Sequence, residues 1–286
     1  MQTFPTMMRS NGFVRFALLL ALVVAVPGCK TVGDWFGKDK EAKTESLPVE
    51  QLYASAKGNL RDGDYSQAQR EYTRLIARFP FGAYSEQSQL ELAYVQYKLG
   101  KPDDATLAID RFIRTYPRHP HIDYAYYLKA VINFDRNVTL FGRLARLDPA
   151  ARDLNGPQTS MTDFNEVVRR YPNSPYAQDS RQRMVYLRNE LARHELSIGL
   201  FYYQRGAWVS ALDRGQYLIE TYPQSQYQGD AVALMAASYT KLGQKVLSDD
   251  SRRVLQQNYP QHPYLRGDWP TSRGLWHKLN PFAGEK

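Results

Sequence analysis

The amino-acid sequence predicts an all-α fold, a superhelical solenoid of about five helix-turn-helix repeats. Apolar and aromatic residues recur at three- and four-residue spacing from Val49 onward, which is the period of an amphipathic helix. These helical segments are broken at regular places by an aromatic residue followed by proline, and glycines lie between the breaks. Breaks that recur in this way indicate similar units stacked along the chain.

Five aromatic-proline pairs mark the ends of the units, and they are Phe79-Pro80, Tyr116-Pro117, Tyr171-Pro172, Tyr222-Pro223 and Tyr259-Pro260. Twelve residues before each proline lies a small residue, and these are Ala68, Ala105, Ser160, Ala211 and Ser248. Five residues earlier still, four units carry glycine: Gly63, Gly100, Gly206 and Gly243. Small side chains let two helices approach closely, glycine permits the tight turn, and proline ends the second helix. The spacing is that of the tetratricopeptide repeat, a helix-turn-helix unit of about 34 residues.

Residues 1–28 read as a signal peptide and are set apart from the fold. Arg9 and Arg15 lead into the apolar run 16–26, which at about 1.5 Å per residue is too short to span a bilayer. Gly28 then supplies a small residue at the cleavage position.

Cys29 is the only cysteine of the chain, and it follows the cleavage position directly. The tetrapeptide Val26-Pro27-Gly28-Cys29 resembles a bacterial lipobox, although Pro27 departs from the usual residue there. The resemblance implies lipidation of Cys29 by a diacylglycerol and an N-acyl chain. Because two or more acyl chains anchor a protein stably, the mature chain is expected to be tethered. Lys30, in place of aspartate, favours the outer membrane and its periplasmic face over the inner membrane.

The predicted domains follow from these patterns. Residues 29–48 form a lipidated flexible tether, and residues 49–263 form the repeat domain. Within that domain we expect N-terminal repeats at 49–136, a third repeat at 137–172 that is split by a loop between Arg136 and Ser160, and C-terminal repeats at 173–263. The C-terminal repeats begin with one long helix from Pro175 to about Gln204. Residues 264–286 form a basic tail whose Trp269 and Trp276 either cap the last repeat or contact a partner, and capping is favoured.

Composition argues against nucleic acid as a partner and against catalysis. The formal net charge of +8 falls to +6 without residues 1–28, which hold two arginines and no acid, and the remaining cations are mixed with acids. His119-Pro120-His121 is the only close histidine pair, and with no cysteine nearby we expect no metal site. No phosphate-binding loop, serine elbow or zincin motif is present, so the sequence predicts no enzyme and no cofactor.

The 21 tyrosines favour a different role. Several lie in clusters on the first helices of the repeats, and they are Tyr94, Tyr97, Tyr124, Tyr126, Tyr127, Tyr202 and Tyr203. We expect most tyrosines to be half-buried packing residues and the others to form an aromatic groove for an extended peptide.

Several segments carry a closer resemblance. They are Phe79-Pro80-Phe81-Gly82, Arg111-Phe112-Ile113-Arg114, Tyr171-Pro172-Asn173-Ser174-Pro175-Tyr176 and Arg183-Met184-Val185-Tyr186-Leu187-Arg188. From Cys29 to about Pro263 the chain resembles the BamD family of outer-membrane assembly lipoproteins, also called ComL. The resemblance implies a non-enzymatic subunit of the β-barrel assembly machine, with BamA, other assembly-machine lipoproteins and unfolded outer-membrane proteins as partners.

The resemblance also implies two sets of partner-binding residues. Gly206-Ala207-Trp208 with Asp213-Arg214 is similar to the family stretch that holds BamA, which implies that Trp208 and Arg214 contact that partner. Asp213 stands where the family has asparagine, so we expect an internal ion pair that weakens the outward one. The N-terminal repeats imply a client-binding pocket, and the residues that would line it are Tyr53, Phe79, Phe81 and Tyr84. The alternative for Phe79 and Phe81 is that they only staple their helix pair together.

A second function stays open at this point. A peptidoglycan-associated envelope lipoprotein would bind glycan strands through the same basic and tyrosine side chains. A hydrolase is the remote third reading, because the sequence offers no nucleophile and base to carry it.

Overall fold

The computed structural model describes residues 47–144 and 155–270, with the side chains of 137–144 excepted. Within these residues the chain forms ten α-helices, one short 3₁₀ helix and no strand. The first helices are α3 (Val49–Arg61), α4 (Tyr65–Arg78), α5 (Ala83–Lys98), α6 (Pro102–Thr115) and α7 (Ile122–Leu144). They are followed by α8 (Asn155–Arg170), α9 (Tyr176–Gln204), α10 (Trp208–Thr221), α11 (Gln228–Lys241), α12 (Lys245–Asn258) and η2 (Pro263–Arg266).

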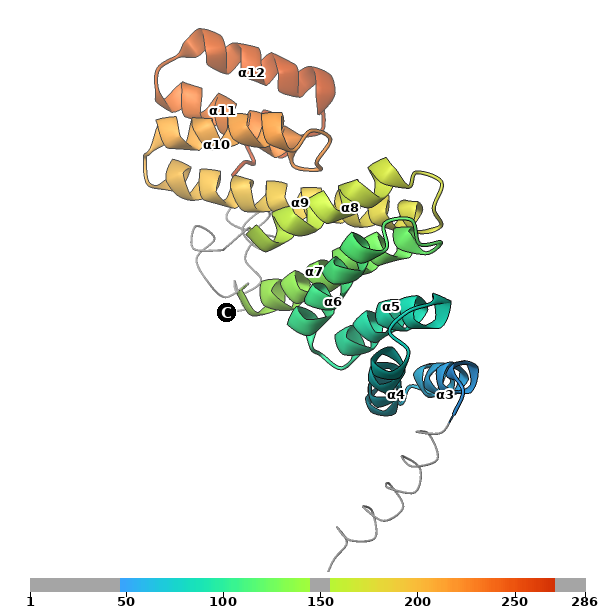
Figure 1. The fold of residues 1–286 in the computed structure, drawn as a ribbon. Coiled ribbons are helices and arrows are strands. Elements are labelled where there is room, and N and C mark those ends of the chain that lie inside the picture. The colour runs from blue at the N-terminus through green and yellow to red at the C-terminus, as the bar shows by residue number, and fades with distance from the viewer. Residues whose placement is uncertain (1–46, 145–154, 271–286) are drawn as a thin grey trace, which may run out of the picture.

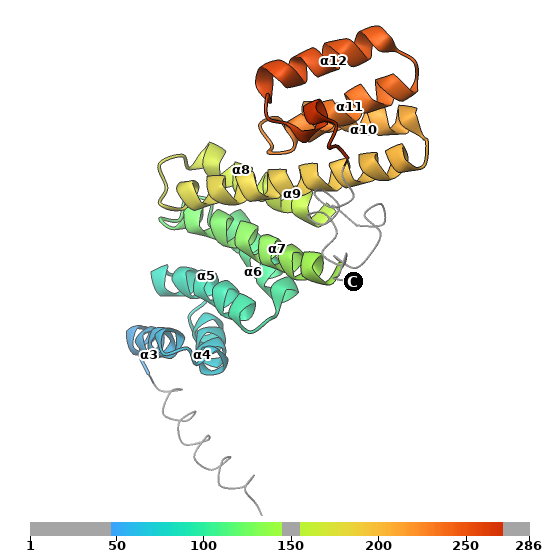
Figure 2. The ribbon, with the colours of Figure 1, turned by 180° about the vertical axis from the view of Figure 1, so that it is seen from behind.

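Each helix packs against the helix before it and the helix after it, so the pairs stack in chain order (Figure 1). The helices α3 and α4 lie at one end of the stack, and α11 and α12 lie at the other, as the reverse view also shows (Figure 2). The predicted all-α solenoid of helix-turn-helix repeats is confirmed.

The glycines and prolines act at the positions predicted for turns and helix ends. Gly63, Gly100, Gly206 and Gly243 have φ of +81°, +71°, +79° and +74°, a left-handed backbone that glycine adopts without steric cost. Helices α4, α6, α10 and α12 each end one residue before the aromatic-proline pair, whose aromatic residue is the C-cap. Proline disfavours the helical conformation of the residue before it, which explains these ends.

The small residues lie where helices meet. Ala68, Ala105, Ser160 and Ala211 are fully buried. Ser248 is only half-buried, because α12 is the last helix of the stack and no further helix covers it in the part of the chain that the structure describes.

The loop expected in the third repeat was placed too widely. Helix α7 continues past Arg136 to Leu144, and α8 begins at Asn155, so 137–144 and 155–160 are helical. Residues 145–154 lie outside the described residues. A single glycine such as Gly142 costs a helix only about 1 kcal/mol. Pro157 is tolerated because it lies in the first turn of α8, where N–H groups have no helical partner. The long helix after Pro175 is confirmed as α9.

Tyrosine-carboxylate hydrogen bonds join successive first helices of the repeats. The hydroxyl of Tyr53 on α3 donates to Glu91 on α5 at 3.1 Å, and that of Tyr127 on α7 donates to Asp179 on α9 at 2.7 Å. Between them, Tyr97 on α5 donates to Asp135 on α7. Burial, together with the hydrogen bond to Asp179, raises the pKa of Tyr127 to about 12. We call these three bonds the tyrosine ladder.

The start of the C-terminal tail packs back on the last repeat. Trp269 is only 8% exposed and belongs to the largest hydrophobic cluster among the described residues, to which α9, α10, α11 and α12 contribute. Its indole Nε1 donates to Asp230 on α11 at 3.1 Å, and His262 Nε2 lies at the same distance from that carboxylate oxygen. Capping is thus confirmed for Trp269, whereas Trp276 lies outside the described residues.

Candidate functional site

The first candidate surface is aromatic and lies on α3, α5 and the turn before α5. Tyr53 and Tyr84 are brought together, with ring centroids 5.3 Å apart. Phe81 is 88% exposed, so it does not staple the helix pair. Phe79 caps α4 and lies under the guanidinium of Arg78, which is 4.9 Å from its ring centroid. The structure therefore joins two of the four predicted client-binding residues and presents a third to solvent.

A buried carboxylate lies beneath this surface. Glu91 is 5% exposed, and its two oxygens accept hydrogen bonds from Tyr53 at 3.1 Å and from Tyr72 at 2.5 Å. Lys57 forms an ion pair with the same group, and Gln87 donates to it at 2.9 Å. Burial first, and then the hydrogen bond and charge of Glu91, raise the pKa of Tyr72 far above its ordinary value. The aromatic surface is thus held by a charged centre that joins α3, α4 and α5.

Sequence reasoning missed Glu91. An acid within the apolar run Leu90 to Val95, next to the small residue Ala93, was the available signal. Buried acids are rare unless they are paired, so this position indicates donors on the neighbouring helices.

The second candidate surface surrounds Arg214 on α10. Its guanidinium is 39% exposed and lies 2.9 Å from the carboxylate of Glu195, which is 6% exposed and belongs to α9. An internal ion pair of Arg214 was expected with Asp213, but its partner in the structure is Glu195. The reason is geometric, because adjacent residues on a helix point in different directions whereas α9 and α10 pack face to face.

Trp208 lies at the start of the same helix. Its ring contacts Tyr203 edge to face, with centroids 5.1 Å apart, and Lys241 lies 5.9 Å from its centroid. Trp208 therefore joins the ends of α9, α10 and α11 and is half-buried. Its position on the helix of Arg214 agrees with the predicted surface, but its contacts within the chain are also structural.

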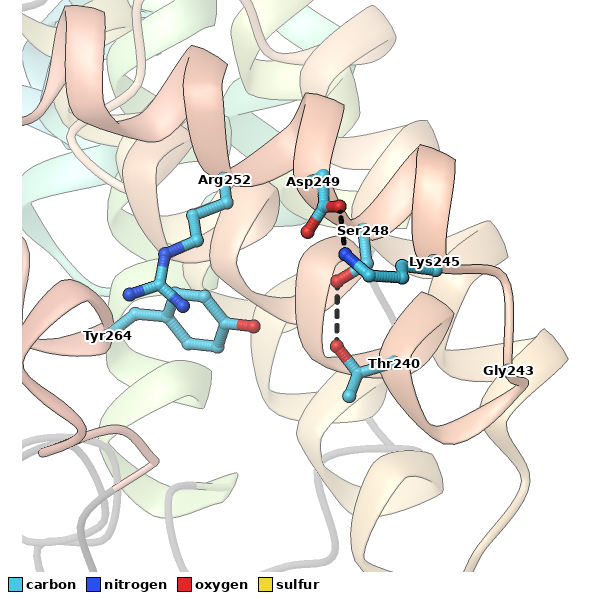
Figure 3. Close-up of a pocket in the computed structure, with 7 residues that line it drawn as sticks. All are labelled: Thr240, Gly243, Lys245, Ser248, Asp249, Arg252 and Tyr264. Atoms are coloured by element: carbon cyan, nitrogen blue, oxygen red, sulfur yellow. Dashed lines mark hydrogen bonds and ion pairs between the residues drawn. The ribbon is translucent and has the colours of Figure 1, made fainter.

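A shallow pocket of about 320 Å³ lies between α11, α12 and the tail (Figure 3). Its polar groups are mostly engaged with one another. Lys245 pairs with Asp249 at 2.6 Å, and the hydroxyls of Thr240 and Ser248 lie 2.7 Å apart. The pocket contains two cations, Lys245 and Arg252. Lys245 is paired, whereas Arg252 has no ion pair among the described residues.

Within the described ranges, no three or more His, Cys, Asp or Glu side chains are grouped so as to hold a metal ion. None of the helices in this part of the chain combines the length and apolar character needed to cross a membrane.

Comparison with known proteins decides the family. A family model named YfiO and described as an outer membrane lipoprotein matches residues 45–255. A relative from Xylella fastidiosa (strain 9a5c), an outer membrane protein assembly factor BamD, is 46% identical over 270 residues, which cover 94% of this chain and 90% of that protein. The chain belongs to the BamD family. The resemblance inferred from the sequence is thereby confirmed.

Other members of the BamD family align over most of the chain. The BamD of Neisseria meningitidis serogroup B (strain MC58) is 37% identical over 263 residues, covering 92% of this chain and 97% of its own. Among solved structures, a thermophilic TPR protein of Thermus thermophilus aligns with a TM-score of 0.35 at 15% identity, covering 77% of this chain and 96% of its own. An assembly factor has a non-enzymatic role, and as a BamD-family member the chain is not an enzyme. Cys29 lies outside the described residues.

Proposed function

We propose that the chain is a lipid-anchored subunit of the β-barrel assembly machine at the periplasmic face of the outer membrane. In this role the C-terminal repeats hold BamA beside the other assembly-machine lipoproteins, and the N-terminal repeats receive unfolded outer-membrane proteins. Cys29 carries the diacylglycerol and the N-acyl chain. The observation that carries the proposal is the relationship to BamD proteins over more than nine-tenths of the chain.

The aromatic surface on α3 and α5 supports the client-binding part. Phe81 offers a nearly free ring, and the Tyr53–Tyr84 pair lies on the neighbouring helices. Rigid aromatic side chains contribute contact area at little cost in rotamer entropy, which suits the binding of many extended segments. Phe79 is the weaker member, because Arg78 already covers its ring.

The first experiment purifies the full-length protein from its own envelope in mild detergent and analyses it by mass spectrometry. We expect triacylated Cys29 in the N-terminal peptide and BamA among the co-purifying proteins. A lipidated chain that arrives with peptidoglycan and without BamA would replace this proposal with the cell-wall function.

Client binding is tested by site-specific photo-crosslinking. A benzoylphenylalanine at Phe81 should crosslink to an unfolded outer-membrane protein with an intact C-terminal aromatic residue. Leu107 is the matched control, because it is also strongly exposed but belongs to α6, which contributes no residue to the aromatic surface. Equal crosslinking at the two positions would remove the client-binding role from Phe81.

A further inference from the structure

The loops between repeats carry exposed arginines on one side of the stack. Because the helices of each repeat run antiparallel, α4, α6 and α8 end on the side on which α3, α5, α7 and α9 begin. The α6–α7 and α8–α9 loops lie next to each other on this side, at the right in Figure 1 and at the left in Figure 2. Arg111 and Arg114 lie near the end of α6, Arg118 in the loop to α7, and Arg181 in the second turn of α9. We call these four residues the arginine edge.

Contacts between the loops make this edge one continuous surface. Ser174 in the α8–α9 loop donates a hydrogen bond to Asp123 at the start of α7 at 2.7 Å. The guanidinium of Arg181 donates to the carbonyl of Pro172 in the same loop at 3.4 Å. The tyrosines that follow α6 and α8 pack on the same hydrophobic cluster. Residues more than 50 positions apart in the sequence are thereby held side by side.

The four arginines have positive charge that the chain itself does not neutralise. All four are exposed, and none has an ion pair within the described ranges. Among the acids nearby, Glu166 and Asp179 are paired with arginines of their own helices, and Asp123 accepts the hydrogen bond from the α8–α9 loop. Glu50 and Glu86, in the first turns of α3 and α5, remain. The unpaired cations therefore outnumber the remaining acids on this edge.

Helix ends favour cations, because the macrodipole leaves the C-terminal end of a helix partly negative. That effect alone does not explain the edge, since α10 and α12 have no basic residue in their last turns whereas α4, α6 and α8 all do. Arg118 and Arg181 also lie outside the last turn of any helix. The excess of cations thus belongs to the repeats nearest the start of α3, where residues 29–48 join the fold.

We infer that the arginine edge binds the anionic phosphate headgroups of the membrane surface to which the chain is tethered. The inference rests on the proposed function, in which Cys29 carries the lipid anchor. A flexible tether over residues 29–48 spans about 25 Å on average, and it enters the fold at the start of α3, on the side of the arginines.

The chemistry of the edge fits this occupant. A guanidinium binds phosphate oxygens through two parallel hydrogen bonds, and each basic residue near an anionic bilayer adds to its attraction. Because the anchor keeps the headgroups close, weak contacts at several exposed side chains act together. An acidic protein is the other class of partner that would match the charge, but nothing holds it near this edge in the same way.

The test uses the mature chain from residue 29 with Cys29→Ser, so that the anchor does not dominate binding. We expect this protein to float with vesicles that contain phosphatidylglycerol, not with vesicles of phosphatidylcholine alone, and to be released by added salt. Arg111→Glu with Arg114→Glu and Arg118→Glu should reduce binding at least tenfold, and the three glutamine changes should give a smaller loss. Arg61→Glu with Lys101→Glu and Arg252→Glu is the matched control, since it makes the same charge change at exposed cations outside the edge.

The outcomes separate this inference from the proposed function. An unmodified Cys29 in protein purified from the envelope would overturn the proposed anchor and the inference that rests on it. A lipidated Cys29, together with equal flotation of the edge variant and the control variant, would overturn the arginine edge alone. Binding of the Cys29→Ser protein to polyglutamate but not to phosphatidylglycerol vesicles would replace the membrane with an acidic protein. Circular dichroism of each variant checks that its helix content is unchanged.

Discussion

The two ends of the solenoid are held together by different forces. Around α3, α4 and α5 the contacts centre on Glu91, and the associated hydrophobic cluster has only four buried members among the described residues. Around α9, α10 and α11 the cluster is the largest in the described chain and is rich in alanine, leucine and aromatic side chains.

Because of this difference, we expect the polar N-terminal end to adapt to a ligand more readily than the apolar C-terminal end. Polar contacts can be exchanged for contacts with a ligand at small net cost, because both states form hydrogen bonds. A close-packed apolar core offers no such exchange. In the proposed function, this difference would suit the N-terminal end to varied extended clients and the C-terminal end to one permanent partner.

The largest effect is expected from Glu91→Ala at the polar end. The change leaves Tyr53, Tyr72 and Lys57 without their common acceptor, and we expect a loss of about 3 kcal/mol in the free energy of unfolding. Urea unfolding measures it, with the exposed Glu50→Ala as control. A loss no larger than that of the control would show that Glu91 does not hold these helices.

At the apolar end, Trp269→Ala should cost about 2 kcal/mol through lost apolar contact and the lost bond to Asp230. Because the tail covers α11, hydrogen exchange should accelerate in α11 and stay unchanged in α3. Acceleration in both helices would mean that the two ends are not independent.

Two glycine substitutions compare a closely packed helix position with an open one. Gly215→Ala should destabilise the protein by about 1–2 kcal/mol, since the Ala231 carbonyl would lie 3.1 Å from the new Cβ and Met235 would have to move. Gly58→Ala on α3 meets nothing within 4 Å and should stabilise by about 0.5–1 kcal/mol. Thermal unfolding gives both values, and matching signs would contradict the proposed difference in packing.

The smallest effect is expected in the pH dependence of the free energy of unfolding. It comes from Asp179, which accepts the last bond of the tyrosine ladder. Burial alone would raise the pKa of Asp179, but hydrogen bonds from Tyr127 and Arg183 and the charge of Arg183 outweigh it and lower the pKa below the ordinary value. A lowered pKa in the folded state gives stability above the unfolded pKa that is lost as the pH falls through the folded pKa. Asp179→Asn should therefore flatten the acid side of the stability curve by less than about 1 kcal/mol, because its side chain is 42% exposed.

Asp163 provides a comparison of opposite sign. Its pKa is raised chiefly by burial, so its contribution to stability decreases as the pH rises through the range between the unfolded and folded pKa values. Urea midpoints measured from acid to neutral pH for Asp163→Asn should therefore change in the opposite sense to those for Asp179→Asn. The same sense in both variants would contradict these assignments.

The repeat boundaries could be predicted from sequence because they depend on local chemistry. A left-handed glycine and an aromatic-proline pair act within a few residues, and their spacing predicted the turns and the ends of α4, α6, α10 and α12. The third repeat was misjudged where Gly142 and Pro157 occupy helical positions that tolerate them.

Side-chain partners between helices could not be predicted in the same way. Glu91 meets donors from α3 and α4, and Arg214 meets Glu195 on α9, so each contact depends on how two helices are rotated against each other. The sequence period identifies the buried face of a helix but does not say which residue of the neighbouring helix lies opposite.

The tyrosine ladder also has a mechanical consequence. Its three bonds connect α3 to α5, α5 to α7, and α7 to α9, and so form one line along the stack. They act in parallel with the main chain and with the packing of α4, α6 and α8, so a pull at the first repeat would be shared between these bonds and that packing. Beyond α9 the ladder gives way to close alanine and glycine packing, which resists compression better than extension. We therefore expect the N-terminal repeats to deform more readily under load than the C-terminal repeats.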